Sequence, residues 1–176
     1  MSRRPRVVVV TGSSSGIGRA VAERLLEVGD TVLGLARDHS KSAPTRGAYL
    51  PIVVDLGDLA AAADVLDALA RDHPGIDAVV SNAGAGDFAE IERFSAAQIR
   101  AAIDLNLTSH LLVARAFLPG LKRRGGDLLF VGSVSGRRGR RRGAVYSAAK
   151  FGLRGLAQAL RDQCARAAVR VTLLSA

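Results

Sequence analysis

Short apolar runs alternate along the chain with longer stretches in which apolar residues recur every three or four positions. The runs predict buried β-strands at residues 6–11, 31–36, 49–55, 76–82, 127–131 and 170–174. The longer stretches predict amphipathic helices at residues 17–28, 59–71, 95–117 and 146–166. Strands that alternate with helices are typical of a parallel sheet with helices on both faces. We therefore predict an α/β fold of three layers, α/β/α, around a doubly wound parallel sheet with the strand order 3-2-1-4-5-6.

Local signals refine several boundaries of these elements. Pro51 cannot donate to a ladder, so its strand is expected at the edge of the sheet. The spacing of Ser95 and Gln98 predicts a capping box at the start of the third helix, and Pro119 predicts its end near Phe117-Leu118. The polar link 37–48 shows no apolar period, so we expect at most one helical turn there.

Composition sets the broad class of the protein. Its 176 residues, 48% of them hydrophobic, fit one globular domain over residues 1–176. Cys164 is the sole cysteine, so no internal disulfide can form, and its apolar helix predicts a buried structural thiol. No apolar run suits a signal peptide or a membrane span of about 20 residues. We expect a soluble cytoplasmic protein and predict no metal site.

A glycine-rich turn joins the first strand to the first helix. Glycines in such a turn let backbone N–H groups approach a pyrophosphate, which the N-terminus of the helix then stabilises. The turn directly follows an apolar strand, so we predict a dinucleotide site there. Its candidate residues are Gly12, Ser14, Ser15, Gly16, Ile17 and Gly18.

The end of the second strand bears on the choice between NAD(H) and NADP(H). An acidic residue there marks NAD, but this chain has Ala36 followed by Arg37. A guanidinium can bind a 2′-phosphate through two hydrogen bonds, so NADP(H) is favoured over NAD(H). Asp38 could contact a ribose or simply belong to the loop. Asp55 and Leu56, at the end of the third strand, are candidates for the adenine edge.

Tyr146 and Lys150 lie four residues apart, on one face of the last predicted helix. A cation beside a phenol favours the phenolate and thereby suits the phenol to proton transfer. Ser133 lies thirteen residues upstream of Tyr146, and its hydroxyl could hold a carbonyl oxygen that the phenol protonates. Such a Tyr–Lys pair alone is also common on solvated helix surfaces, so the assignment depends on the other motifs.

Taken together, the motifs resemble the short-chain dehydrogenase/reductase family, of the classical type. The resemblance runs from the first strand to the last residue and implies a Rossmann-type fold. Its motifs are Thr11-Gly12-x-x-x-Gly16-Ile17-Gly18, Asp55, Asn82-Ala83-Gly84, Asn106, Ser133 and Tyr146-x-x-x-Lys150.

The resemblance implies a role for each catalytic candidate. Tyr146 would be the general acid/base, and Lys150 would favour its phenolate and hold the nicotinamide ribose. Ser133 would orient the substrate carbonyl, and Asn106 would bend its helix and anchor a water in the proton path from Lys150. Asn82, Ala83 and Gly84 would belong to the cofactor site. The long helices commonly pair across a two-fold axis in this family, so we expect a homo-oligomer.

The end of the sequence departs from the family pattern. Members usually continue through a Pro-Gly turn that contacts the nicotinamide, a segment that covers the substrate, and a seventh strand. Ala176 falls about where that proline would stand. We therefore expect one of three cases: the sequence is part of a longer enzyme, a partner supplies the missing edge, or activity has been lost. Ser81, where the family often has a first asparagine, is a second departure and a harmless one.

The resulting functional prediction is NADP(H)-dependent interconversion of a carbonyl and a secondary alcohol. Two alternatives of other classes are an NADP-binding regulatory subunit or pseudoenzyme without turnover, and a basic nucleic-acid-binding module. The formal net charge of +9 bears on the last of these. No aromatic residue lies among the basic residues 137–142, which disfavours binding of single-stranded nucleic acid.

Much of the positive charge is local. Five arginines lie within residues 137–142, and Lys122-Arg123-Arg124 forms a second cluster. The first cluster lies between Ser133 and Tyr146, so it must border the mouth of the predicted active site. It is either a solvated basic loop, a contact for an anionic substrate or carrier, or a nucleic-acid contact. The anionic candidates are a carboxylate, a phosphopantetheine or coenzyme A group, and an acidic carrier protein.

Overall fold

The computed structural model of the protein describes residues 4–40 and 47–176. Its strands form one six-stranded parallel sheet in the predicted order, β3-β2-β1-β4-β5-β6. The strands are β1 (Val7–Thr11), β2 (Thr31–Ala36), β3 (Tyr49–Val53), β4 (Ala78–Ser81), β5 (Gly126–Gly132) and β6 (Val169–Ser175). The prediction of a doubly wound α/β sheet is confirmed, and β3 with its Pro51 lies at the edge.

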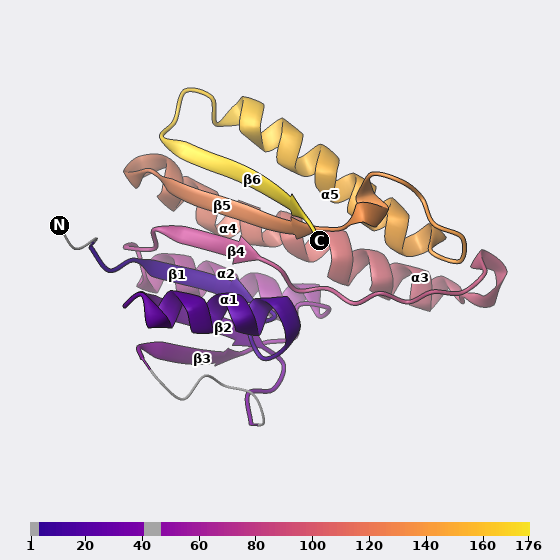
Figure 1. Ribbon diagram of the computed structural model, residues 1–176, viewed down its shortest axis with the longest axis horizontal. Coiled ribbons are helices and arrows are strands. Elements are labelled where there is room, and N and C mark those ends of the chain that lie inside the picture. Colours follow the sequence, from indigo (N-terminus) through magenta and orange to yellow (C-terminus); the bar gives the residue numbers. More distant parts are fainter. Residues whose placement is uncertain (1–3, 41–46) are drawn as a thin grey trace.

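Helices cover both faces of the sheet, but unequally (Figure 1). On one face lies α1, and on the other face lie α2, α4 and α5. The helices are α1 (Gly16–Glu27), α2 (Leu59–Asp72), α3 (Ala96–Ile103), α4 (Ser109–Arg124) and α5 (Ala144–Gln163), with short 3-10 turns η1 (Ile91–Arg93) and η3 (Val134–Gly136). No described helix is long and apolar enough to cross a membrane.

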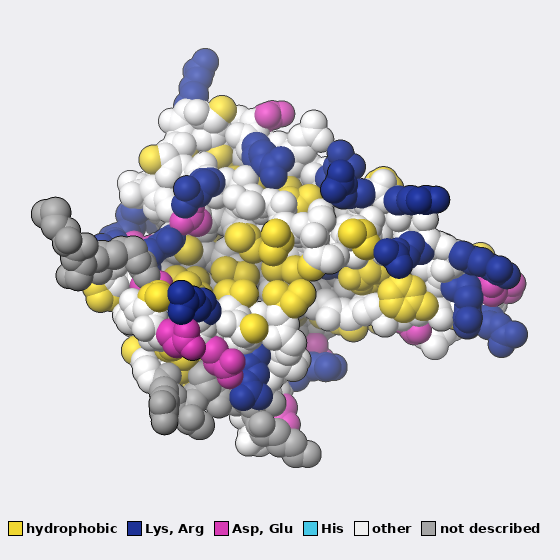
Figure 2. Space-filling model, in the orientation of Figure 1, with side chains coloured by type: hydrophobic (Ala, Val, Ile, Leu, Met, Phe, Trp, Pro, Cys, Tyr) yellow, Lys and Arg dark blue, Asp and Glu magenta, His cyan; other side chains and the backbone are white. Residues whose placement is uncertain are grey.

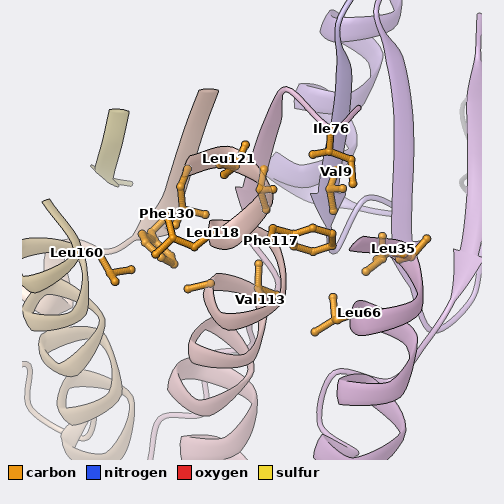
Figure 3. Close-up of a cluster of buried hydrophobic side chains, with 14 of the residues drawn as sticks. Val9, Leu35, Leu66, Ile76, Val113, Phe117, Leu118, Leu121, Phe130 and Leu160 are labelled. Atoms are coloured by element: carbon orange, nitrogen blue, oxygen red, sulfur yellow. The ribbon is translucent and has the colours of Figure 1, made fainter. Parts of the chain in front are cut away.

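The larger part of the core lies between the sheet and the three helices on its second face. Val9, Leu35 and Phe130 project from the strands toward Leu66 of α2 and Phe117 of α4 (Figure 3). These side chains are at most 2% exposed. The burial favours the observed register of β1, β2 and β5, because a shift by one residue would turn these side chains to the opposite face. The carboxyl ends of the parallel strands lie at one edge of the sheet.

The third predicted helix differs from the expectation in two respects. Ser95 and Gln98 form the predicted capping box, but a π-helical turn, η2 (Asp104–Thr108), separates α3 from α4. The prediction that the helix ends before Pro119 is wrong, since α4 continues through it to Arg124. Leu121 beyond the proline is 1% exposed, and its burial in the core offsets the lost hydrogen bond of a proline inside a helix.

Smaller differences concern the ends of elements and the link between β2 and β3. The third strand ends at Val53 rather than at residue 55, and α5 ends at Gln163 rather than at residue 166. Cys164 follows α5 and is buried, as predicted. The centre of the link, residues 41–46, lies outside the described residues, and the described parts on either side hold no helical turn.

Candidate active site

A cleft of about 470 Å³ lies at the carboxyl edge of the sheet, where the parallel strands end. This edge is the usual ligand site of open α/β sheets. Fourteen of the sixteen predicted site residues line the cleft, drawn from segments that are far apart in the sequence. They are Gly12, Ser14, Ser15, Gly16, Ile17, Arg37, Asp55, Leu56, Asn82, Ala83, Gly84, Ser133, Tyr146 and Lys150. The other two, Gly18 and Asn106, lie behind its wall.

The glycine-rich turn has a conformation that few other residues could adopt. Gly12 and Gly16 have φ angles of 67° and 53°, in the left-handed region. A Cβ on Gly18 would overlap the carbonyl oxygen of Gly12, so Gly18 serves the close packing of the turn. No side chain caps the first turn of α1, whose N-cap residue is Ser15. The backbone N–H groups of this turn are therefore available to an anion.

A compact set of hydrogen bonds joins the ends of β1 and β4. The hydroxyl oxygen of Thr11 accepts from the backbone N–H groups of Asn82 and Ala83, at 2.8 and 2.9 Å. The side-chain amide of Asn82 donates to the carbonyl oxygen of Thr11, at 2.9 Å. These bonds hold the glycine-rich turn beside the segment that follows β4, and both of these segments line the cleft.

Arg37 stands at the opposite end of the cleft from the tyrosine, on the segment that follows β2. Its side chain is exposed, and no carboxylate pairs with it among residues 4–40 and 47–176. The Asp38 carboxylate instead accepts from the N–H of Ser40, at 2.8 Å. That hydrogen bond lowers the pKa of Asp38 and directs its carboxylate toward the backbone of Ser40. Asp55 likewise accepts from the N–H of Gly57, at 2.8 Å.

Tyr146 and Lys150 lie one turn apart on α5, as the spacing predicts. The Lys150 ammonium lies 5.7 Å from the centre of the Tyr146 ring and donates to the carbonyl oxygen of Val131, at 3.3 Å. Only 3% of Lys150 is exposed, and burial lowers its pKa to about 8. At neutral pH the lysine is therefore still a cation, placed directly behind the phenol.

Ser133 directly follows β5 on the same side of the cleft. Its hydroxyl oxygen accepts from the N–H of Ser135, at 3.1 Å, within the short turn η3. The hydroxyl hydrogen is not used by this contact and can be donated into the cleft. The carbonyl oxygen of Ala176 accepts from the N–H of Val134, at 3.1 Å, which places the end of β6 beside this turn.

Asn106 occupies the middle of the π-helical turn and is 1% exposed. Its amide donates to the carbonyl oxygens of Ala102 and Ala85, both at 2.9 Å, and its oxygen accepts from the N–H of Ala85, at 3.2 Å. A Cβ on Gly84 would lie 2.8 Å from that oxygen and 3.5 Å from the Lys150 ammonium. Asn106 therefore supports the segment after β4, immediately behind Lys150.

Two contacts of the site escape prediction from the sequence. Phe88 packs edge-to-face on Tyr146, with ring centres 5.5 Å apart, although it lies in an irregular segment without a motif.

Ser81 and the buried His110 form a hydrogen bond of 2.6 Å, and burial, with the nearby Lys150 charge, lowers the pKa of His110 to about 3. The histidine is therefore neutral and adds no second charge behind the lysine. The spacing from Asn106 to His110, one helical turn, is a signal that could have singled it out.

The fold and the cleft are those of a doubly wound α/β protein with a ligand site at the carboxyl ends of its parallel strands. The sequence model of the short chain dehydrogenase family matches residues 6–176, and the chain belongs to this family. The family resemblance predicted from the motifs is therefore confirmed.

Individual relatives cover most of the chain. The 3-dehydrosphinganine reductase TSC10B of Arabidopsis thaliana is 38% identical, over 96% of this chain and 54% of the relative. The 3-oxoacyl-[acyl-carrier-protein] reductase FabG of Vibrio cholerae is 32% identical, over 99% of this chain and 74% of the relative. The chain thus spans about half the length of the plant reductase and about three quarters of the bacterial one.

Solved structures show the same arrangement. A metagenomic short-chain oxidoreductase in complex with NADP superposes with a TM-score of 0.89 at 32% identity, covering 97% of this chain and 81% of that one. A short-chain dehydrogenase from Streptomyces avermitilis has a TM-score of 0.90 at 30% identity, covering 99% of this chain and 66% of that one.

Proposed function

We propose that the protein is an NADP(H)-dependent oxidoreductase that interconverts a carbonyl and a secondary alcohol, with Tyr146 as its general acid/base. One observation carries the proposal: a single cleft brings the glycine-rich turn together with Tyr146, Lys150 and Ser133. Both named reductases among the relatives act on carbonyl compounds, as their names state. When bound, NADP(H) supplies or accepts the hydride.

The residues of the cleft fit such a cofactor. The uncapped N-terminus of α1 offers backbone N–H groups to a pyrophosphate. Arg37 offers a guanidinium to a 2′-phosphate, and Ala36 beside it is too small and apolar to bind a ribose diol as a carboxylate would. A relative crystallised with NADP supports the same preference. Lys150 and the segment 82–85 border the other end of the cleft, where the nicotinamide side would lie.

The catalytic roles follow from the positions of the protein's own groups. Ser133 donates its free hydroxyl hydrogen to the carbonyl oxygen of the substrate, and Tyr146 donates its proton to the same oxygen. Lys150 lies 5.7 Å from the ring and stabilises the phenolate that remains. Asn106 holds the segment 84–85 and acts as a positioning residue for Lys150.

The arginine cluster 137–142 supports an anionic or carrier-bound substrate. All five arginines are exposed, and Arg141 lies 3.9 Å from Glu90 in a loose ion pair. Gly143 at the end of the cluster packs near Phe88, which itself contacts Tyr146, so the cluster borders the mouth of the cleft. Figure 2 shows Lys and Arg side chains gathered at the end of the molecule where this loop lies in Figure 1. We therefore place the anionic part of the substrate there.

The proposal is tested by hydride transfer from NADPH to a panel of ketones, including thioesters of coenzyme A. We expect turnover in the wild type and its loss in Tyr146→Phe. NADPH binding without turnover would support the regulatory alternative instead. Replacing Arg137 and Arg138 by glutamine should raise KM for the anionic ketones and leave KM for neutral ketones unchanged. Arg154→Gln, which removes an exposed charge from α5, is the matched control.

We also propose that the protein acts in the cytoplasm as a homo-oligomer. Leu111 of α4 and Phe151 of α5 are 43% and 44% exposed, on the two helices that we expect to pair across a two-fold axis. Light scattering after size-exclusion chromatography measures the oligomeric state directly. Leu111→Glu is expected to shift an oligomer toward the monomer, because a charge would then be buried at the interface.

A further inference from the structure

Three side chains form a continuous hydrogen-bonded chain beside the Arg37 end of the cleft. The hydroxyl groups of Ser13 and Tyr49 are 2.8 Å apart. The Tyr49 hydroxyl is 3.1 Å from Nδ1 of His39, and Nε2 of His39 is 3.1 Å from the carbonyl oxygen of Ile52. The rings of His39 and Tyr49 also meet edge-to-face, with centres 5.9 Å apart.

The row of hydrogen-bonded side chains passes across strand β2, and the small size of Gly34 makes this possible. Tyr49 lies on β3, whereas Ser13 follows β1, and β2 lies between them. A Cβ on Gly34 of β2 would overlap the hydroxyl and the ring of Tyr49. Glycine inside a strand costs about 0.5–1 kcal/mol relative to alanine, so its presence needs a reason. The tyrosine that passes over it supplies that reason.

The direction of each hydrogen bond follows from its fixed end. The carbonyl oxygen of Ile52 can only accept, so Nε2 of His39 is the donor, and in the tautomer with its hydrogen on Nε2 the Nδ1 atom is the acceptor. Tyr49 therefore donates to His39 and can accept from Ser13. The Ser13 hydroxyl also lies 3.4 Å from the carbonyl oxygen of Leu35, a longer contact than the 2.8 Å to Tyr49. Burial raises the pKa of Tyr49, which keeps its donor proton in place.

The Ser13 end and the His39 end of this hydrogen-bonded row differ in the other contacts that hold them in place. At one end, the backbone N–H groups of Gly12 and Ser13 both donate to the carbonyl oxygen of Leu35, at 2.8 and 3.2 Å. Two backbone hydrogen bonds thus anchor the glycine-rich turn to β2, in addition to the longer contact of the Ser13 hydroxyl with the same carbonyl oxygen. At the other end, the hydrogen bond from Ser40 to Asp38 is local to the loop. His39 joins that loop to β3 and, through Tyr49, to the glycine-rich turn.

We propose that Ser13, Tyr49 and His39 act as a positioning bridge that holds residues 37–40 in place and thereby sets the selectivity for NADPH over NADH. Arg37 lies two residues before His39, so the anchored ring fixes the segment from which the guanidinium projects. The inference deepens the proposed NADP(H) dependence and rests on it. Loss of the bridge should weaken the contact with the 2′-phosphate and leave the pyrophosphate contact in place.

The test measures the dissociation constants of NADPH and NADH by fluorescence titration for the wild type, Tyr49→Phe and Arg37→Ala. Phenylalanine keeps the ring over Gly34 and removes only the hydroxyl. We expect the Kd for NADPH to rise about 5- to 30-fold, on the order expected when a hydrogen-bonded network is broken, and the Kd for NADH to stay within about twofold. In the Arg37→Ala background, Tyr49→Phe should have no further effect on NADPH, because the bridge acts through Arg37.

Two variants of His39 provide the control. Asparagine keeps an acceptor near the position of Nδ1, so His39→Asn should retain part of the selectivity, whereas His39→Leu should lose it. An equal rise in Kd for NADPH and NADH, or an unchanged Kd for NADPH, would overturn the proposal. Either result would show that the three hydrogen-bonded side chains only stabilise the edge strand. A wild type that binds neither cofactor refutes the proposed function itself, and with it the bridge.

Discussion

Lys150 should make the folded protein less stable than it would be with an apolar side chain, because its ammonium is buried. Burial lowers its pKa from the ordinary value of 10.5 to about 8. A difference of this size corresponds to about 3 kcal/mol of folding free energy at neutral pH. Methionine would also lose the hydrogen bond to Val131, worth about 1 kcal/mol. Lys150→Met should therefore be inactive yet more stable by about 2 kcal/mol at pH 7.

The pH dependence of this difference has a defined sign. Below pH 8 the lysine is charged in both states, and the folded protein bears the full cost of burying the charge. Between pH 8 and 10.5 the folded state loses its proton before the unfolded state does, so wild-type stability rises relative to the variant. The advantage of Lys150→Met should accordingly shrink across this range and disappear near its upper end.

Urea denaturation at several pH values measures the difference, with unchanged m-values as evidence that the denatured states are comparable. Arg154→Met is the matched control, since it removes one exposed cation from the same helix. That variant should change the free energy of unfolding by less than about 0.5 kcal/mol at every pH. A Lys150→Met protein that is less stable at pH 7, or an advantage that does not vary between pH 8 and 10.5, would refute the reasoning.

Two further predictions concern stability, and thermal or urea unfolding checks both. Gly34→Ala should lower the free energy of unfolding by about 1–3 kcal/mol, because its Cβ would overlap Tyr49, whereas Gly155→Ala on α5, where nothing lies within 4 Å, should raise it by about 0.5–1 kcal/mol. If both glycines respond alike, the account of Gly34 is wrong. Thr11→Val should cost about 2 kcal/mol or more, because two backbone N–H groups lose their acceptor. An unaffected Thr11→Val protein would show that the β1–β4 junction is held by other contacts.

The periodic pattern predicts the sheet because each of its signals is local. A strand such as β1 is apolar at its first four positions because both its faces are buried, and parallel order follows from the intervening helices. The cleft is predictable for the same reason, since residues that directly follow parallel strands must meet at one edge. The positions of Gly12, Arg37, Asn82 and Ser133 follow from this rule alone.

Features that depend on contacts between distant segments were not predictable. The passage of α4 through Pro119 depends on the burial of Leu121, which only the packed core reveals. Phe88 meets Tyr146 through an irregular segment with no period to read. His39 lies near the start of the polar link 37–48 and Tyr49 directly follows that link, and nothing in their spacing indicates a shared hydrogen bond.

The central claim, that this cleft transfers a hydride with Tyr146 as the acid, is tested most directly with NADPH deuterated at the transferred position. Mass spectrometry of the alcohol formed from a ketone substrate reports whether deuterium reaches the carbinol carbon. We predict one deuterium per product molecule with the wild type, and a rate about 10²- to 10⁴-fold lower with Tyr146→Phe, which should still bind NADPH. Alcohol without deuterium, or an undiminished rate in Tyr146→Phe, would contradict the claim.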